Sequence, residues 1–508
     1  MKHSLLIASI LVSSSAALAQ TPDDAIRQSY QIPQGTARNM AIGGAMGSLG
    51  GDITSAHVNP AGLGFYKTGE IVISPGFNFL NNKFDFRGTN QADKKNNFTY
   101  GTSGVVFGWV DEYNTKHSSA ISLSVNQVAN YNNFVHYKGF NNVSSWSEQY
   151  LEQLSRDNAN PTAAEQNYIF GSSLAFRTYL VDTTTFNGQP AYQSLVPISQ
   201  GVNQENTIDT KGGQHEISLG FASNKNDKFY LGGSVNLDIY SFTKNQTYKE
   251  SDPTNNLNNS FSFFEYKEEY HSSGVGFNAK VGVIYKPADK IRLGLAIHTP
   301  TFASMTDKIR SSMTTNTEGY AGTKSESSDN LNSGDPGVYK YTMTTPFKAI
   351  LSASYVFNEV KDVRRQKAFI TADVEFVPHK GTQYDITEGG SAEDQEYYKS
   401  VNQAIDQRYK GALNARVGGE VKFTTIMARA GFAYYSNPYK DSKELKNNRM
   451  LLSGGLGWRD KGKFIDVTYV YSIVKDTNIP YYLADQPNTF AVGKNNKGNV
   501  MLTFGFKF

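Results

Sequence analysis

The residue types that most often carry enzyme chemistry are poorly placed in this sequence. None of the eight histidines is spaced as H-x-x-x-H or H-E-x-x-H, the patterns that direct two imidazoles to one zinc ion. The chain has no cysteine, no G-x-S-x-G turn to present a serine nucleophile, and no pair of carboxylates spaced for acid–base catalysis. We therefore expect no enzymatic activity, no bound metal and no cofactor.

A glycine-rich stretch from Gly43 to Gly51 is another candidate for a chemical site, because such loops can cradle phosphates. It matches neither G-x-x-x-x-G-K-[ST] nor the G-x-G-x-x-G pattern that follows a strand. Tight packing of the chain is the better interpretation.

Charged residues recur at alternate positions of segments that have the pattern of strands. Ten are expected on the polar faces of these strands: Asp238, Arg292, His298, Asp373, Glu375, Arg416, Glu420, Lys422, Arg429 and Asp466. Charges buried without partners are costly to desolvate, so a network of ion pairs and water is the simplest expectation. Candidates for contacts with a ligand or with the N-terminal segment are Arg292, His298, Arg416, Glu420 and Arg429. Alternatively, Arg292 or Arg429 could hold a ligand carboxylate.

The strands that would carry these charges alternate between apolar and polar residues. Between residues 229 and 242 the odd positions are mainly apolar and the even positions largely polar, and the last segment alternates in the same way up to Phe508. Such segments of about ten residues, separated by turns, are typical of transmembrane β-barrels. An all-β fold with fourteen antiparallel strands is predicted, at 70–79, 99–111, 118–131, 214–224, 229–242, 263–287, 290–303, 338–357, 367–378, 411–422, 426–436, 449–459, 463–475 and 497–508.

Residues 1–19 have the features of a secretory signal peptide, with an apolar stretch and a small-residue cleavage site at Ala17-Leu18-Ala19. Beyond it, the sequence has no uncharged apolar run of the ~18 residues that a membrane-spanning helix needs. Basic and acidic residues are nearly balanced, at 49 and 46, which argues against a nucleic-acid partner. We expect an exported protein of the bacterial outer membrane.

The predicted strands are joined by short and long connections in strict alternation, as in single-chain outer-membrane barrels. The barrel is expected over residues 68–508, with long external loops at 132–213, 304–337 and 379–410. In the first of these loops Tyr150, Leu151 and Leu154 fall at helical spacing just after Trp146. This apolar stripe is interpreted either as a groove that captures ligand or as an anchor for the loop.

Residues 20–67 precede the first strand and are too few for an independent domain with its own core. The lumen of a fourteen-stranded barrel is wider than its own side chains can fill, so this segment is predicted to be a hatch inside it. Within the segment, Asn59-Pro60-Ala61 is expected to form a rigid corner, because proline fixes φ and restricts the residue before it. The corner is interpreted as an anchor or gate of the hatch, and the alternative is an ordinary Asn-Pro turn.

Two stretches of this segment, 35–45 and 59–63, resemble the hatch of the FadL/TodX family of outer-membrane transport proteins, which carries an Asn-Pro-Ala motif. Residues 292–300, 415–420 and 428–432 are similar to strands of that family. The resemblance implies a monomeric barrel that captures hydrophobic molecules between external loops. Long-chain fatty acids and aromatic hydrocarbons are the implied ligands, which would pass through a lumenal pocket and leave sideways into the bilayer.

Two other functions remain open at this point. The polar external loops also suit a FadL-like component of a secretion system that docks a cargo or partner protein. An outer-membrane phospholipase is the enzymatic alternative, and it would require a serine and a histidine that meet on the barrel wall. The expected partners are a hydrophobic small molecule and outer-membrane lipid or lipopolysaccharide.

Overall fold

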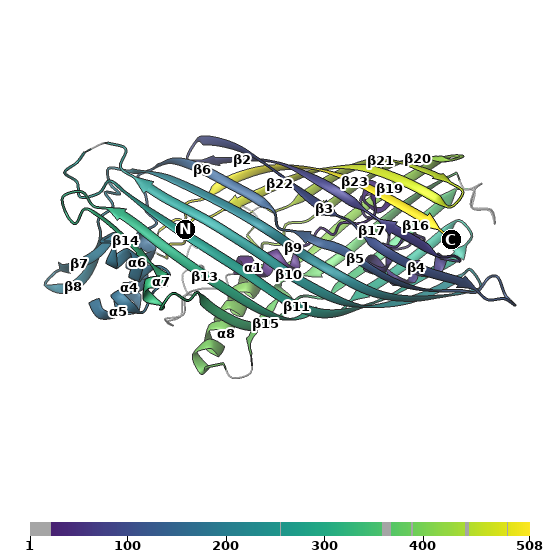
Figure 1. Ribbon diagram of the computed structural model, residues 1–508, viewed down its shortest axis with the longest axis horizontal. Coiled ribbons are helices and arrows are strands. Elements are labelled where there is room, and N and C mark those ends of the chain that lie inside the picture. Colours follow the sequence, from purple (N-terminus) through teal and green to yellow (C-terminus); the bar gives the residue numbers. More distant parts are fainter. Residues whose placement is uncertain are drawn as a thin grey trace.

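The computed structural model describes residues 22–254, 256–357, 367–387, 390–441, 445, 447–484 and 486–508, so the predicted signal peptide at 1–19 lies outside the described part. One antiparallel sheet of 21 strands closes on itself as a barrel, and a two-stranded hairpin stands apart from it (Figure 1). Short breaks divide several barrel strands into two elements each. When the two parts of each divided strand are counted together, the 21 elements form fourteen strands plus one short added strand, which confirms the predicted fold.

The fourteen barrel strands follow one another around the wall in chain order. They are β1 with β2 (Glu70–Ile73, Pro75–Phe86), β3 with β4 (Thr89–Tyr100, Ser103–Val110), β5 with β6 (Ser118–Asn130, Asn133–Asn141), β9 (Val202–Lys225), β10 (Phe229–Ser251), β11 (Phe263–Ala288), β12 with β13 (Ile291–His298, Phe302–Asn316), β15 with β16 (Gly337–Thr344, Lys348–Phe357), β17 with β18 (Ala368–Pro378, Gln383–Ile386), β19 (Gly411–Phe423), β20 (Ile426–Tyr435), β21 (Arg449–Asp460), β22 (Lys463–Asn478) and β23 (Ala491–Lys507). β23 pairs with β22 on one side and with β1 and β2 on the other, which closes the barrel.

Each spanning strand exposes its apolar residues and buries its polar ones, the reverse of a soluble protein. On β12, Leu293 and Leu295 are exposed while Arg292 and His298 are buried. The same inversion places Phe504 and Phe506 of β23 on the outside and Thr503 inside. An outer surface of this kind is stable against hydrocarbon, with polar groups turned to the lumen.

The barrel wall extends further on the external side than the sequence predicts. β9, β10 and β11 have 24, 23 and 26 residues, and β13 occupies more than a third of the expected loop at 304–337. The expected loop at 132–213 likewise contains β6 and the first half of β9, and the expected gap at 80–98 is a tight hairpin of β2 and β3. These loop boundaries were wrong because apolar alternation ends where the lipid ends, whereas backbone pairing continues into water.

The external connections are folded rather than extended. They contain α4 (Glu148–Arg156), α5 (Pro161–Gln166), α6 (Ser172–Arg177), the hairpin β7–β8 (Val181–Phe186, Gln189–Ser194), β14 (Thr323–Ser327), α7 (Ser328–Leu331), η3 (His379–Gly381) and α8 (Ala392–Arg408). None of the helices in the described part of the chain is long and apolar enough to cross a membrane. In Figure 1, α4 to α7 and the β7–β8 hairpin gather at one end of the barrel, and α8 projects from its side.

The N-terminal segment contains α1 (Pro22–Ser29), α2 (Ala37–Ala41), α3 (Ser55–Val58) and the 3-10 helix η1 (Pro60–Phe65). Helix α2 begins where the side chain of Thr36 caps the backbone N–H of Asn39, and η1 begins at Asn59, which caps Ala61 and precedes a proline at the first helical position. The segment is almost entirely buried and packs against inward faces from β5 around to β23. It therefore occupies the lumen.

Candidate functional site

The amide side chain of Asn59 bonds the corner at Asn59-Pro60-Ala61 both to the N-terminal segment itself and to the inner wall. Asn59 Nδ2 donates to Gly47 O at 2.6 Å and to Val283 O at 3.3 Å, and its Oδ1 accepts from the backbone N–H of Ala61 at 3.1 Å. The wall facing the corner is made of Gly232 and Gly282, where an added Cβ would collide with Pro60 and Asn59. The corner thus contacts strands β10 and β11 of the wall, and its role as an anchor or gate stays a prediction.

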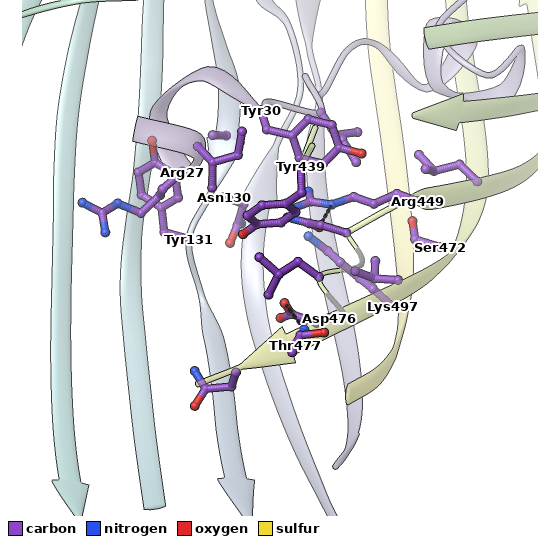
Figure 2. Close-up of a pocket in the computed structure, with 18 of the residues that line it drawn as sticks. Arg27, Tyr30, Asn130, Tyr131, Tyr439, Arg449, Ser472, Asp476, Thr477 and Lys497 are labelled. Atoms are coloured by element: carbon purple, nitrogen blue, oxygen red, sulfur yellow. Dashed lines mark hydrogen bonds between the residues drawn. The ribbon is translucent and has the colours of Figure 1, made fainter. Parts of the chain in front are cut away.

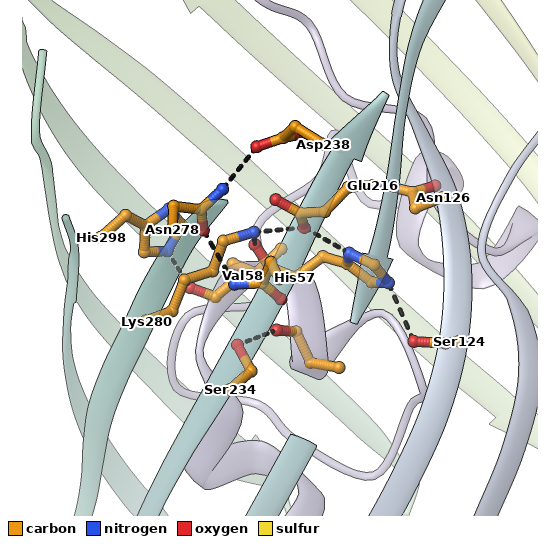
Figure 3. Close-up of polar contacts among 12 residues, drawn as sticks. His57, Val58, Ser124, Asn126, Glu216, Ser234, Asp238, Asn278, Lys280 and His298 are labelled. Carbon is orange, nitrogen blue, oxygen red and sulfur yellow. Dashed lines mark hydrogen bonds and ion pairs between the residues drawn. The ribbon is translucent and has the colours of Figure 1, made fainter. Parts of the chain in front are cut away.

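A buried polar network lies beside this corner (Figure 3). His57 Nδ1 is 2.6 Å from Glu216 Oε1 on β9, and His57 Nε2 is 2.9 Å from Ser124 Oγ on β5. Lys280 of β11 forms an ion pair with Glu216 and donates to His57 O at 3.2 Å. Burial lowers the pKa of His57, which belongs to the N-terminal segment and not to a membrane-spanning strand. A neutral ring fits these contacts, with Nδ1–H donating to the carboxylate and Nε2 accepting from the serine.

The contacts of Ser124, His57 and Glu216 resemble the order of groups in a serine hydrolase. The serine and histidine that the phospholipase alternative required do meet. Glu216, however, is neutralised directly by Lys280. The arrangement ties the N-terminal segment to three strands, β5, β9 and β11.

Four of the five predicted lumenal residues contact the N-terminal segment directly. Arg292 Nη1 donates to Leu49 O at 2.6 Å, and His298 Nε2 lies 2.9 Å from Val58 O. The other two contacts are Arg416 Nη1 to Gly44 O at 3.5 Å and Glu420 to Arg38 at 3.6 Å.

The remaining predicted residue, Arg429, lies in an ion-pair network on the wall. Its guanidinium bonds to Glu420 at 2.6 Å and to Asp466 at 2.5 Å, while Arg416 forms an ion pair with Glu375. Arg292 and Arg429, the two alternatives for holding a ligand carboxylate, are therefore both engaged by the protein.

A cavity of about 380 Å³ lies between α1, the external ends of β21 to β23, and the end of β5 (Figure 2). Its lining is apolar at Ile26, Met40, Leu451 and Val470, among others. The charged lining residues are four cations and one carboxylate: Arg27, Arg408, Arg449, Lys497 and Asp476.

Two of these cations lie together on one side of the cavity. Arg449 stands on β21 and Lys497 on β23, separated by Ser472 on β22, which pairs directly with Lys497. The Arg449 guanidinium also covers the ring of Tyr30 at 4.6 Å. Arg449 and Lys497 were not among the residues predicted from the sequence, although inward-facing positions at the external ends of strands were the signal that could have found them.

The barrel wall is interrupted beside this cavity, between β3 and β5. β5 pairs with β4 up to Val125 and then bulges between Gln127 and Ala129, and β6 continues paired with β9 alone. Within the described residues, the ladder of β3 is formed with β2 and not with β5 or β6. We call this part of the wall the seam. It is the boundary between residues 126–141 on one side and β3 on the other.

Side chains close the seam where the backbone does not. Lys95 Nζ donates to Asn133 O at 3.2 Å and to Thr210 O at 2.8 Å. On the outer side, Tyr100 Oη lies 2.6 Å from His215 Nδ1 of β9, with the two rings stacked at 5.5 Å. Because Ala129, Asn130 and Tyr131 line the cavity, the seam separates the cavity from the outside of the barrel.

The predicted loop residues lie in a packed external cluster. Trp146, Tyr150 and Leu154 are buried with Tyr248 and Tyr481, and Leu151 packs on the cluster's edge. Trp146 Nε1 donates to Tyr150 Oη at 2.8 Å. These contacts favour the anchoring interpretation of the stripe over a capture groove.

No family model and no curated protein sequence matches this chain. Solved structures do match it. A FadL homologue of Pseudomonas aeruginosa superposes with a TM-score of 0.55 at 15% identity, over 94% of this chain and 100% of that one. The toluene transporter TodX of P. putida superposes with a TM-score of 0.50 at 12% identity, over 94% of this chain and 99% of that one. The chain shares the fold of these two proteins along nearly its whole length.

Proposed function

We propose that this chain is an outer-membrane transporter of the FadL/TodX type, that its ligand is a hydrophobic acid, and that the N-terminal segment is its hatch. The observation that carries the proposal is the position of the 380 Å³ cavity, which is bordered by the hatch on one side and by the seam on the other. A ligand in this cavity has a short path through the wall and a closed path along the barrel axis.

The chemistry of the cavity sets the ligand class. Apolar lining favours a hydrocarbon chain or ring by about 0.8 kcal/mol for each buried CH₂ group. Arg449 and Lys497 supply charge-assisted donors for one carboxylate, a geometry that guanidinium groups match well. Arg449 and Lys497 thus replace Arg292 or Arg429 as the residues proposed to hold a ligand carboxylate.

Release through the seam follows from how firmly the hatch is held. Asn59, His57 and Arg292 bind it to separate strands, β11, β9 and β12, so moving it as a body would break these buried contacts together. Opening the seam breaks a few side-chain contacts, such as that between Tyr100 and His215, and no backbone ladder. Sideways release also delivers an apolar ligand to lipid without passing through water.

The test is ligand binding to the purified protein in nanodiscs, with dodecanoate, dodecanol and toluene compared by calorimetry. We expect dodecanoate to bind most tightly and the Arg449→Gln/Lys497→Gln variant to bind it at least about tenfold more weakly, with dodecanol unchanged. Lys308→Gln, which changes an exposed cation on the outside of β13, is the matched control. Equal binding of dodecanoate to the double variant and to the control would refute the assignment.

A further inference from the structure

Four lysines form a compact group on the outer surface of the barrel, on the neighbouring strands β22, β23, β2 and β3. These strands run side by side along the upper edge of Figure 1. The group consists of Lys475, Lys494, Lys83 and Lys94, all of them exposed.

Three of the four lysines stand directly opposite one another in the ladder. Lys475 pairs with Lys494, and Lys494 pairs with Lys83. Lys94 is diagonal to Lys83, because its direct partner is Asn81. Like charges directly opposite in an antiparallel pair are destabilising, since their Cβ atoms are about 5 Å apart.

Elsewhere the same outer surface pairs opposite charges. Lys138 stands opposite Glu205 on β9, and Glu269 of β11 stands opposite Arg310. Around the lysine group, by contrast, Asp85 is the single carboxylate among the outward positions of 81–86, 90–96, 473–477 and 492–496. A row of three opposed lysines is therefore a local departure that calls for an anion outside the chain.

The height of the group on the wall indicates which anion this is. Lys83 and Lys94 lie four residues beyond Phe79 and Phe98, the last exposed aromatic residues of the apolar band on their strands. With strands tilted as in other barrels, four residues raise the ammonium groups roughly 10 Å above the hydrocarbon. The group is on the external side, because it lies toward the rim that carries the longest connections, residues 142–201 and 479–490 among them.

We infer that Lys83, Lys94, Lys475 and Lys494 form a binding site for the phosphate groups of a phosphorylated glycolipid in the outer leaflet. Acyl chains of the lipid lie against the exposed apolar residues below, such as Phe79 and Tyr469, while its phosphates neutralise the opposed lysines. The inference rests on the barrel spanning the outer membrane and is independent of any transported ligand.

The test compares the full chain with Lys83→Gln/Lys475→Gln/Lys494→Gln, both delipidated in detergent. Native mass spectrometry follows binding of three probes: lipid A with two phosphates, the same lipid dephosphorylated, and inorganic phosphate. The control variant is Lys211→Gln/Lys308→Gln/Lys340→Gln, which removes three exposed lysines from β9, β13 and β15.

We expect bisphosphorylated lipid A to bind the unchanged chain and the control variant alike, and the test variant roughly a hundredfold more weakly. Without lipid, the test variant should unfold at a higher temperature than the unchanged chain, because the repulsion between the lysines is gone.

Equal lipid binding by test and control variants would overturn the inference. So would equally tight binding of dephosphorylated lipid, and inorganic phosphate binding as tightly as lipid A would reduce the group to a general anion site. Dodecanoate binding should be the same in all three proteins, so failure here is distinct from failure of the transport proposal.

Discussion

At the residue scale, Glu250 holds the external end of the barrel together. Its Oε1 accepts from Trp146 N at 2.8 Å, Gln204 Nε2 at 2.8 Å and Tyr248 Oη at 2.9 Å, and its Oε2 lies 2.6 Å from Ser145 Oγ. The carboxyl group is fully buried beyond the apolar band, and burial raises its pKa to about 7 despite these donors. A proton on Oε2 is accommodated, because the hydroxyl of Ser145 can accept it.

This pKa predicts that the external cluster loses stability as the pH rises. Between the ordinary carboxyl pKa near 4.5 and about 7, the unfolded chain releases the proton of Glu250 first, so the free energy of unfolding falls with pH and is constant above 7. The total change is up to about 3 kcal/mol. Hydrogen exchange of the α4 amides, corrected for intrinsic rates, measures it.

The matched variant is Glu250→Gln, which keeps the shape of the side chain and a donor for Ser145 but cannot titrate. Its α4 amides should show the same protection at pH 5 and pH 8. A pH slope that persists in the variant would show that another group carries it.

Single residues were predictable where one strand sufficed to place them. Alternation along one strand predicts that Arg292 and Arg416 face the lumen, whichever strands lie next to theirs. Both residues contact the N-terminal segment, which agrees with this prediction. The set of His57, Glu216 and Lys280 was missed, since it comes from three segments separated by more than sixty residues along the chain. Residue types and spacing within one segment do not show which residues of distant segments come into contact.

At the element scale, glycines on the inner face of the wall set how closely the N-terminal segment can approach. Gly418 and Gly431 are paired on β19 and β20, and an added Cβ at either would strike the backbone of Ile42 or Gly43. At these positions the segment therefore lies directly on the backbone of the wall.

Gly431→Val should displace the N-terminal segment and raise single-channel conductance in planar bilayers, because a wide lumen without its plug conducts ions. Gly454→Val is the control, since Gly454 faces outward on the next strand and an added Cβ has its nearest contact at 3.8 Å. Unchanged conductance in Gly431→Val, with the protein still folded as a barrel, would contradict the close seating described here.

The strands themselves were predictable only over their lipid-facing part. β3 illustrates the reason: between Thr89 and Asn97 it has a single apolar residue, Ala92, yet it pairs with β2 along its whole length. Outside the membrane, both faces of a strand meet water or polar neighbours, and the period of two disappears from the sequence while the hydrogen bonds remain.

At the scale of the whole molecule, the proposed function makes the seam and the lumenal cavity parts of one path. If ligand leaves through the seam, joining its two sides must stop transport. The chain has no cysteine, so Tyr100→Cys/His215→Cys provides a clean pair for a short reducible cross-linker. We expect uptake of a fluorescent long-chain fatty acid to be lost after cross-linking and regained after reduction.

The control for this experiment is Thr243→Cys/His271→Cys. These residues stand directly opposite on β10 and β11, where the ladder is continuous, so cross-linking there should not alter uptake. Uptake that survives a complete cross-link of the seam would place the exit elsewhere.

The fourteen-stranded barrel was predictable as a whole because parity, alternation and connection length all constrain it together. The seam was not, because it depends on one bulge at Gln127 to Ala129 and on which strands fail to pair, a matter of geometry between segments. The cavity could not be predicted from the sequence for the same reason.

The closing pair of strands has a consequence for how the molecule is made. The end of β23 pairs with β1, and Phe508 exchanges both backbone hydrogen bonds with Gly69, two residues after the N-terminal segment ends. The ladder between β23 and β1 therefore closes the ring directly beside the point where the N-terminal segment enters the barrel. The segment is also bonded to the closing strand itself, because Ala37 N donates to Thr503 Oγ1 of β23 at 2.7 Å. We expect the interior to be in place when this edge docks, with the N-terminal segment acting as a template for closure.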